Sequence, residues 1–167
     1  MNLKYAVKSE DTEQIQAVNW AHWYTKQYPE LKWLHHIPNG GSRNKAEAVK
    51  LQQMGVKAGV ADLFLPSPKG IYCGLYIEMK YGDNRKTARQ KEFLTDMAAN
   101  GYFVVTCYSA DEAVRVLEEY VSLPHGFMRD DVRKYVGSSM GGGIEDCTMS
   151  IPNNSILKDG RVKPGGR

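Results

Sequence analysis

The sequence predicts an α/β domain in which a mixed β-sheet carries helices on its faces. Stretches with apolar residues at helical spacing alternate with short apolar runs that are typical of buried strands. A helix over 87–100 lies between two such runs, one ending at Lys80 and one containing Val104. That order indicates a crossover between parallel strands, whereas the turn at 66–70 indicates an antiparallel hairpin. The sheet is therefore expected to be mixed.

Two helices and one strand are expected in the N-terminal part of the chain. They are a helix over 12–24, a strand over 31–37 and a helix over 44–54. Ser9 or Asp11 can cap the first helix, because either side chain accepts a hydrogen bond from an N–H group of the first turn. Pro29 ends the first segment, and Gly55 is expected to end the second helix.

The remaining elements of the predicted domain follow the second helix. They are strands over 61–65 and 71–80, a helix over 87–100, a strand over 102–108 and a helix over 109–121. Gly101 is expected to end the helix that precedes the third of these strands. Ser109 and Glu112 have the spacing of a capping box, which predicts that the last helix starts at Ser109.

The composition of the chain indicates the extent of the folded domain and argues against several classes of protein. We expect a folded domain over residues 1–123 and a Gly-rich, basic and largely flexible extension over 124–167. No apolar run approaches the roughly 20 residues that cross a bilayer, and the N-terminus has no apolar signal-peptide core. The three cysteines lack CxxC spacing, which argues against a zinc site or a disulfide framework. A cytoplasmic protein without membrane contact or an organic cofactor is therefore expected.

The distribution of charge along the chain is more informative about a binding partner than the net charge. The net charge of +3 and the pI of about 8.7 are only mildly basic. Basic residues gather after the strand that ends at Lys80, and they are Lys80, Arg85, Lys86, Arg89 and Lys91. Such a cluster is either a surface for phosphate groups or a solvated loop and helix start.

Two acidic residues are expected to meet on the hairpin. Asp62 begins one of its strands, and Glu78 and Lys80 end the other. Side chains alternate along a strand, so Glu78 and Lys80 share one face while Met79 points to the other. The hairpin turn brings Asp62 opposite residues 76–78. A carboxylate from each strand is therefore expected at one edge of the sheet.

Two converging carboxylates suit a hard divalent cation such as Mg²⁺ or Mn²⁺. A bound cation lowers the pKa of a water molecule and stabilises the negative charge that builds on a phosphate. A lysine beside it can position the water or add its own positive field. Asp62, Glu78 and Lys80 therefore predict a metal-dependent phosphodiesterase site. The alternative is a Glu78–Lys80 pair that ends a strand and frays into solvent.

Several short segments together resemble a known family. They are His36–Gly41, Gly55–Leu63, Ile77–Lys80, Gln90 and Gly101–Tyr102. From His36 to about Tyr120 the chain resembles the stand-alone, phage-type VRR-NUC nucleases of the PD-(D/E)XK superfamily. The resemblance implies a restriction-endonuclease-like fold and a metal-dependent DNA endonuclease. Ala61 stands where the superfamily name suggests proline, and no Arg-Arg pair follows the strand that contains Val104.

The resemblance also implies roles for individual residues. Asp62 and Glu78 would bind Mg²⁺ or Mn²⁺, and Lys80 would assist the attacking water. The glutamate that the family takes from its first helix resembles Glu13, a residue that helix-dipole stabilisation explains equally well, and Glu10 is the competing candidate. Glu13 would be a further metal ligand and catalytic residue. Gln90 resembles the glutamine of the helix that follows the catalytic strand.

DNA is the expected partner of such a site. The residues expected to contact it are Asn39, Arg43, Lys45, Arg85, Lys86 and Arg89. A homodimer with two active sites is expected by analogy with junction-resolving members of the superfamily. Specificity for a branched structure, such as a junction or flap, is one of the substrate preferences open to such an enzyme. The alternative function is that of a non-catalytic DNA-binding or accessory protein that retains the nuclease fold.

Overall fold

The computed structural model describes residues 7–39 and 45–124 of the chain. In chain order the elements are α1 (Glu10–Trp23), η2 (Tyr24–Lys26), η3 (Pro29–Trp33), β1 (His35–His36), α2 (Lys45–Gln53), β2 (Leu63–Leu65), β3 (Leu75–Met79), α3 (Ala88–Ala99), β4 (Phe103–Cys107) and α4 (Ala110–Ser122). The elements η2 and η3 are 3₁₀-helices. Apart from Pro124, the extension predicted over 124–167 lies outside the described residues.

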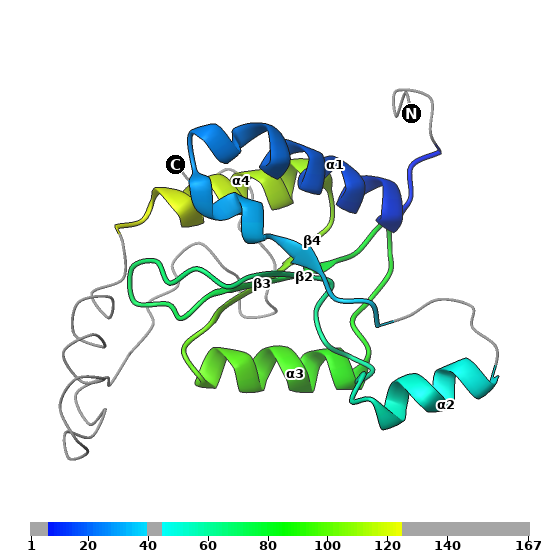
Figure 1. Ribbon diagram of the computed structural model, residues 1–167. Coiled ribbons are helices and arrows are strands. Elements are labelled where there is room, and N and C mark those ends of the chain that lie inside the picture. Colours follow the sequence, from blue (N-terminus) through cyan, green and yellow to red (C-terminus); the bar gives the residue numbers. More distant parts are fainter. Residues whose placement is uncertain (1–6, 40–44, 125–167) are drawn as a thin grey trace, which may run out of the picture.

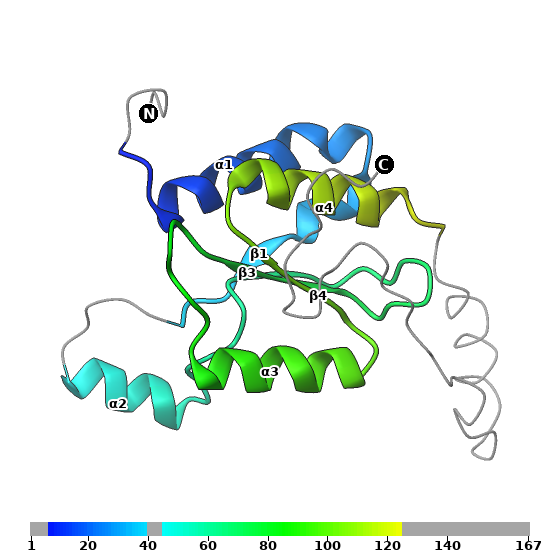
Figure 2. The same cartoon turned by 180° about the vertical axis from the view of Figure 1, so that it is seen from behind.

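The four strands form one sheet in the order β1-β2-β3-β4. β2 pairs antiparallel with both β1 and β3, and β4 pairs parallel with β3. α1 and α4 cover one face of this sheet, and α3 covers the other face (Figure 1, Figure 2). The predicted α/β class with a mixed sheet and flanking helices is therefore confirmed. None of the helices in the described ranges has both the length and the apolar character needed to cross a membrane.

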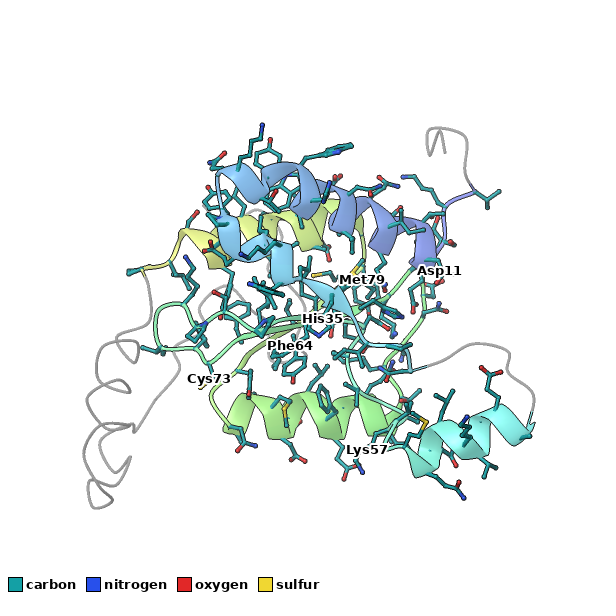
Figure 3. The ribbon with its side chains drawn as sticks, viewed as in Figure 1. Asp11, His35, Lys57, Phe64, Cys73 and Met79 are labelled. Carbon is teal, nitrogen blue, oxygen red and sulfur yellow. The ribbon has the colours of Figure 1, made fainter. Side chains whose placement is uncertain are left out.

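The main core lies between the sheet and the pair formed by α1 and α4. Its residues are Ala17, Ala21, Leu31, Leu63, Leu65, Tyr72, Leu75, Ile77, Met79, Val105, Cys107, Ala113, Val116, Leu117, Tyr120 and Val121. On the opposite face, Phe64 stacks on Tyr76 with ring centroids 4.3 Å apart, and Phe93 of α3 meets Tyr76 edge-on. Figure 3 shows Met79 and Phe64 on opposite sides of the sheet. The alternation expected of strand residues thus holds, and Met79 points away from Glu78 as predicted.

Helix ends follow local hydrogen bonding. Of the two predicted caps of the first helix, Ser9 is the one used, and α1 starts at Glu10, two residues earlier than predicted. At α4 the Ser109 hydroxyl accepts from the Glu112 N–H group at 3.2 Å. The predicted capping box does not close, because the Glu112 carboxylate accepts from the Tyr108 N–H group at 2.7 Å.

The strand predicted over 31–37 is wrong for most of its length. A 3₁₀-helix occupies Pro29–Trp33, and the strand that remains is only His35–His36. Proline fits the first turn of a helix, because its φ is already close to the helical value and an N–H group at that position would have no partner within the helix. Beyond the strand, the Ile37 N–H group still donates to the Asp62 carbonyl at 2.8 Å. Pro38 has no N–H group to continue the pairing.

The predicted hairpin is confirmed, but its turn is longer than 66–70, since pairing with Leu65 begins only at Leu75. Lys69, which is 4% exposed, accounts for this difference. Its ammonium group donates to the Val121 carbonyl at the end of α4 at 2.9 Å and forms an ion pair with Glu30. The turn therefore folds over the end of α4 instead of continuing the ladder.

Gly59 packs the loop before β2 against the beginning of α3, and Gly59→Ala is expected to destabilise the protein more than Gly55→Ala. Both glycines have positive φ, 92° and 97°, so each substitution costs about 1 kcal/mol of backbone strain. A Cβ at Gly59 would lie 2.6 Å from the Arg89 Cβ, whereas a Cβ at Gly55 meets no described atom within 4 Å. We expect an additional loss of about 1–3 kcal/mol at Gly59, measured by urea denaturation of both variants. Equal losses would contradict this packing.

Candidate metal and catalytic site

The register of the hairpin brings Asp62 and Glu78 together. Leu63 pairs with Ile77, so the next residues outward, Asp62 and Glu78, lie opposite each other. The Met79 N–H group donates to Asp62 Oδ2 at 2.8 Å and fixes this carboxylate against the end of β3. Leu63 and Ile77 belong to the core beneath α1 and α4. Asp62 and Glu78 therefore lie on the α3 face of the sheet.

Lys80 extends β3 by one residue, because its N–H group donates to the Cys107 carbonyl at 2.8 Å. The Lys80 ammonium group donates to Glu78 Oε1 at 2.5 Å and to the Met79 carbonyl at 2.8 Å. Glu10 Oε1 lies 3.6 Å from the same nitrogen. Glu78 is 0% exposed and Lys80 is 5% exposed. Their burial excludes the alternative in which the pair frays into solvent.

Gln90 connects α3 to Glu78. Thr87 caps this helix, since its hydroxyl accepts from the Gln90 N–H group at 3.3 Å and its own N–H group donates to Gln90 Oε1 at 2.8 Å. The Nε2 group of the same Gln90 amide donates to Glu78 Oε1. The capping box therefore orients the amide, so that Gln90 and Lys80 both donate to one oxygen of Glu78.

The two glutamates at the beginning of α1 have different surroundings. Glu10 is half-buried and lies near the Lys80 ammonium group, as described above. Glu13 is buried, and its Oε2 accepts from the Ala110 N–H group at 2.7 Å. That bond satisfies a free N–H group at the beginning of α4. Of the two candidates, Glu10 is the one whose carboxylate lies beside the Lys80 ammonium group, and a metal-binding role of Glu13 stays a prediction.

Burial shifts the protonation of the site. Burial, together with the charge of Asp62, raises the pKa of Glu78 from 4.5 to about 7, although the Lys80 ammonium group opposes the shift. Burial also raises the pKa of Asp62, against the hydrogen bond from Met79. For Lys80, burial lowers the pKa, but the hydrogen bond and charge of Glu78 outweigh it and the net direction is upward. Lys80 is therefore charged at neutral pH, while Glu78 readily holds a proton.

The second oxygen of the Glu78 carboxylate fits a cation. Glu78 Oε2 is buried and has no hydrogen-bond partner among the described residues, which is costly for a polar atom. Within residues 7–39 and 45–124, no three His, Cys, Asp or Glu side chains are grouped as metal ligands. Mg²⁺ is commonly held by one or two carboxylates, because it keeps several of its waters. Asp62 and Glu78 therefore fit a Mg²⁺ site with two protein carboxylates.

The residues predicted to contact DNA differ in their placement. Arg85 and Arg89 are exposed around the beginning of α3. Asn39 is half-buried, and its amide donates to a backbone carbonyl of the segment that leads into β2. Lys45 is the first residue of α2, and Arg43 lies outside the described residues. Both arginines are thus exposed, Arg85 in the loop before α3 and Arg89 in its first turn.

Thr106 is a site residue that the sequence does not reveal. Lys86, expected only as a DNA contact, donates from its ammonium group to Thr106 Oγ1 at 2.9 Å. Thr106 is fully buried and pairs with Glu78 in the register of β3 and β4. A threonine is an ordinary residue in a buried strand, so it does not interrupt the pattern of 102–108. Only the parallel register places it beside Glu78.

In the metal-free protein, we expect the free energy of unfolding to fall as the pH rises from about 4.5 to about 7. Because the pKa of Glu78 in the folded protein is about 7, the folded state holds a proton over this range that the unfolded state releases. The shift corresponds to a loss of about 3 kcal/mol. Urea denaturation in EDTA across this range measures it.

The Glu78→Gln variant is the control for this pH dependence, because its amide does not ionise. It is expected to lose less stability over the same range. A wild-type curve that rises with pH relative to that of Glu78→Gln would contradict the raised pKa of Glu78.

The comparisons with known proteins agree with this geometry. The VRR-NUC domain profile matches residues 6–111, a range that contains Asp62, Glu78, Lys80 and Gln90. A solved structure described as a VRR_NUC domain protein is 32% identical, with a TM-score of 0.60, and the match covers 72% of this chain and 94% of that chain. No curated protein matches the chain. The chain therefore belongs to the VRR-NUC domain family, which has a nuclease-type fold.

Proposed function

We propose that this protein is a Mg²⁺- or Mn²⁺-dependent DNA endonuclease that hydrolyses phosphodiester bonds. The burial and hydrogen bonding of Glu78 are the main support for this proposal. Its carboxylate is fully buried, one oxygen accepts from Lys80 and Gln90, and the other has no partner among the described residues. A carboxylate in this position is costly unless a cation completes its surroundings. Membership in the VRR-NUC family supports the same proposal.

Asp62 and Glu78 would hold the metal ion through carboxylate oxygens. When bound, the ion supplies a water of lowered pKa and stabilises negative charge on the phosphate. We propose Glu10, in place of Glu13, as the glutamate of α1 that supports the site. Glu10 lies 3.6 Å from the Lys80 ammonium group, whereas the Glu13 carboxylate accepts from a backbone N–H group of α4.

Lys80 and Gln90 prepare the site before substrate arrives. Both donate to Glu78 Oε1 and so fix the orientation of that carboxylate. The raised pKa of Lys80 keeps its ammonium group charged at neutral pH, and this positive field favours the charge that develops on the phosphate. A strand holds Lys80 and a helix cap holds Gln90, so neither side chain needs to be ordered during the reaction.

DNA is the proposed substrate, with the exposed Arg85 and Arg89 as contacts to its phosphate groups. A single domain of this size offers little surface to grip a branched substrate. We therefore also propose a homodimer with two active sites that acts on junctions or flaps. Sedimentation equilibrium tests the dimer independently of cutting, because the mass of the assembly is read without substrate.

The protein is expected to cut at least one of a set of labelled linear, nicked, flapped and four-way-junction DNAs in Mg²⁺ or Mn²⁺ but not in EDTA. Asp62→Asn and Lys80→Ala are each expected to lower the cutting rate by about 100-fold or more, because each removes a charge that the site requires. Denaturing gels measure the products. The exposed Asp96 of α3 provides a matched control, since Asp96→Asn is expected to cut at the wild-type rate.

Circular dichroism melting shows whether each variant in this set is folded. Binding of DNA without cutting in any metal, by a folded wild-type protein, would favour the non-catalytic DNA-binding alternative. Equal cutting by wild type and Asp62→Asn would place the chemistry elsewhere in the chain.

Glu10→Ala is expected to affect mainly the cutting rate, whereas Glu13→Ala is expected to affect mainly the stability of the fold. Loss of Glu13 leaves the Ala110 N–H group without its buried acceptor, which costs about 2 kcal/mol of stability. Glu10 is half-buried, and its loss is expected to change stability by less than about 1 kcal/mol while lowering the cutting rate by about 10-fold. Urea denaturation and cutting assays on the same preparations measure both effects. The reverse pattern would return the supporting role to Glu13.

A further inference from the structure

Lys86 brings a second ammonium group to the surroundings of Glu78, and the mechanism proposed above does not use it. Lys86 is half-buried in the loop that leads to α3. Its Nζ donates to Thr106 Oγ1 at 2.9 Å. Thr106 is 0% exposed, so this bond holds the end of a long side chain against the sheet instead of leaving it in solvent.

The Thr106 hydroxyl lies on the same face and at the same level of the sheet as the Glu78 carboxylate. Glu78 and Thr106 are partners in the parallel register of β3 and β4. Ile77 and Val105, one residue earlier on each strand, belong to the core on the opposite face. Neighbouring strands lie about 4.8 Å apart, so the Lys86 ammonium group is held beside the acidic end of the sheet.

The backbone next to Lys86 is fixed as well. The following residue, Thr87, caps α3 and exchanges two hydrogen bonds with Gln90. Gln90 in turn donates to Glu78. The side chain of Lys86 is thus anchored by Thr106. Its backbone is fixed by the next residue, Thr87, which caps α3 and contacts Gln90, the residue that donates to Glu78. Its position relative to Glu78 is therefore set both by β4 and by the cap of α3.

Lys80 and Lys86 are positioned by different groups. Lys80 lies against the carboxylates of Glu78 and Glu10. Lys86 lies against the Thr106 hydroxyl, which fixes its ammonium group at the level of the Glu78 carboxylate. A fixed ammonium group beside a cation-binding carboxylate suits a non-bridging oxygen of a phosphate.

We propose that Lys86 is a catalytic residue that binds the phosphate being cut, through one of its non-bridging oxygens, and that Thr106 is its positioning residue. This inference rests on the proposed nuclease function and adds a substrate contact to it. It distinguishes Lys86 from the exposed Arg85 and Arg89, which would bind phosphate groups away from the reacting one.

The test compares Lys86→Met with Lys26→Met, which removes the same charge from an exposed lysine beyond the far end of α1. Lys86→Met is expected to lower the single-turnover cutting rate in Mg²⁺ by about 10- to 100-fold. With Ca²⁺ in place of Mg²⁺, its DNA affinity is expected to depend on salt with a slope shallower by about 0.9. Lys26→Met is expected to retain the wild-type rate and slope.

Thr106 is tested through its coupling to Lys86. Thr106→Val, which keeps the shape but not the hydroxyl group, is expected to lower the cutting rate of the wild type several-fold and to have no further effect on Lys86→Met. Thr106→Ser keeps the hydroxyl group and is expected to retain most of the activity. Thr25→Val, at an exposed hydroxyl that bonds the His22 carbonyl, is the matched control for the substitution itself.

Two results would overturn the proposal. One is a Lys86→Met variant that cuts and binds DNA like Lys26→Met. The other is a Thr106→Val substitution that lowers the rate as much in Lys86→Met as in the wild type, since its effect would then be structural. If the wild type cuts no DNA, the nuclease function fails, and the salt slopes of Lys86→Met and Lys26→Met still decide whether Lys86 binds phosphate.

Discussion

The Glu78 carboxylate lies without solvent exposure at the end of β3, where one of its oxygens accepts hydrogen bonds from Lys80 and Gln90. A buried carboxylate is tolerated only with such partners, and here they tie both helix layers to one end of the sheet. Gln90 belongs to α3, and Lys80 lies beside Glu10 of α1. The packing of α1 and α3 on the two faces of the sheet is therefore a condition for keeping Glu78 inside.

The charges of the site show why a cation suits it better than protein groups alone. Three carboxylates, from Asp62, Glu78 and Glu10, interact with the Lys80 ammonium group, and these four groups together carry two negative charges when all are ionised. That charge repels a phosphate. A proton on Glu78, whose pKa is raised to about 7, removes one negative charge. A divalent cation at the proposed site would remove both, and it would also give Glu78 Oε2 a partner.

Much of the fold was predictable because it depends on local patterns. The helices over 87–100 and 109–121 have clear caps, and the hairpin follows from two apolar runs around a turn. The strand over 31–37 failed because Pro29 starts a 3₁₀-helix and Pro38 stops the pairing, so apolar content alone was a poor guide. The length of the hairpin turn depended on Lys69, whose buried contacts with Glu30 and the end of α4 are long-range.

The site was predictable to the extent that its residues interrupt a local pattern. Glu78 and Lys80 are charged residues in an apolar strand, and hairpin register then points to Asp62. The choice between Glu10 and Glu13 depends instead on how α1 crosses the sheet: they are three residues apart, on one face of the helix, and small rotations decide which one meets Lys80.

Thr106 has no such signal, since a threonine fits a buried strand and parallel partners are separated by a whole crossover helix. The residues that a sequence conceals are thus those whose role comes from register between distant strands. Lys86 was predicted from the sequence only as a DNA contact, and its place beside Glu78 becomes visible once β4 is aligned with β3.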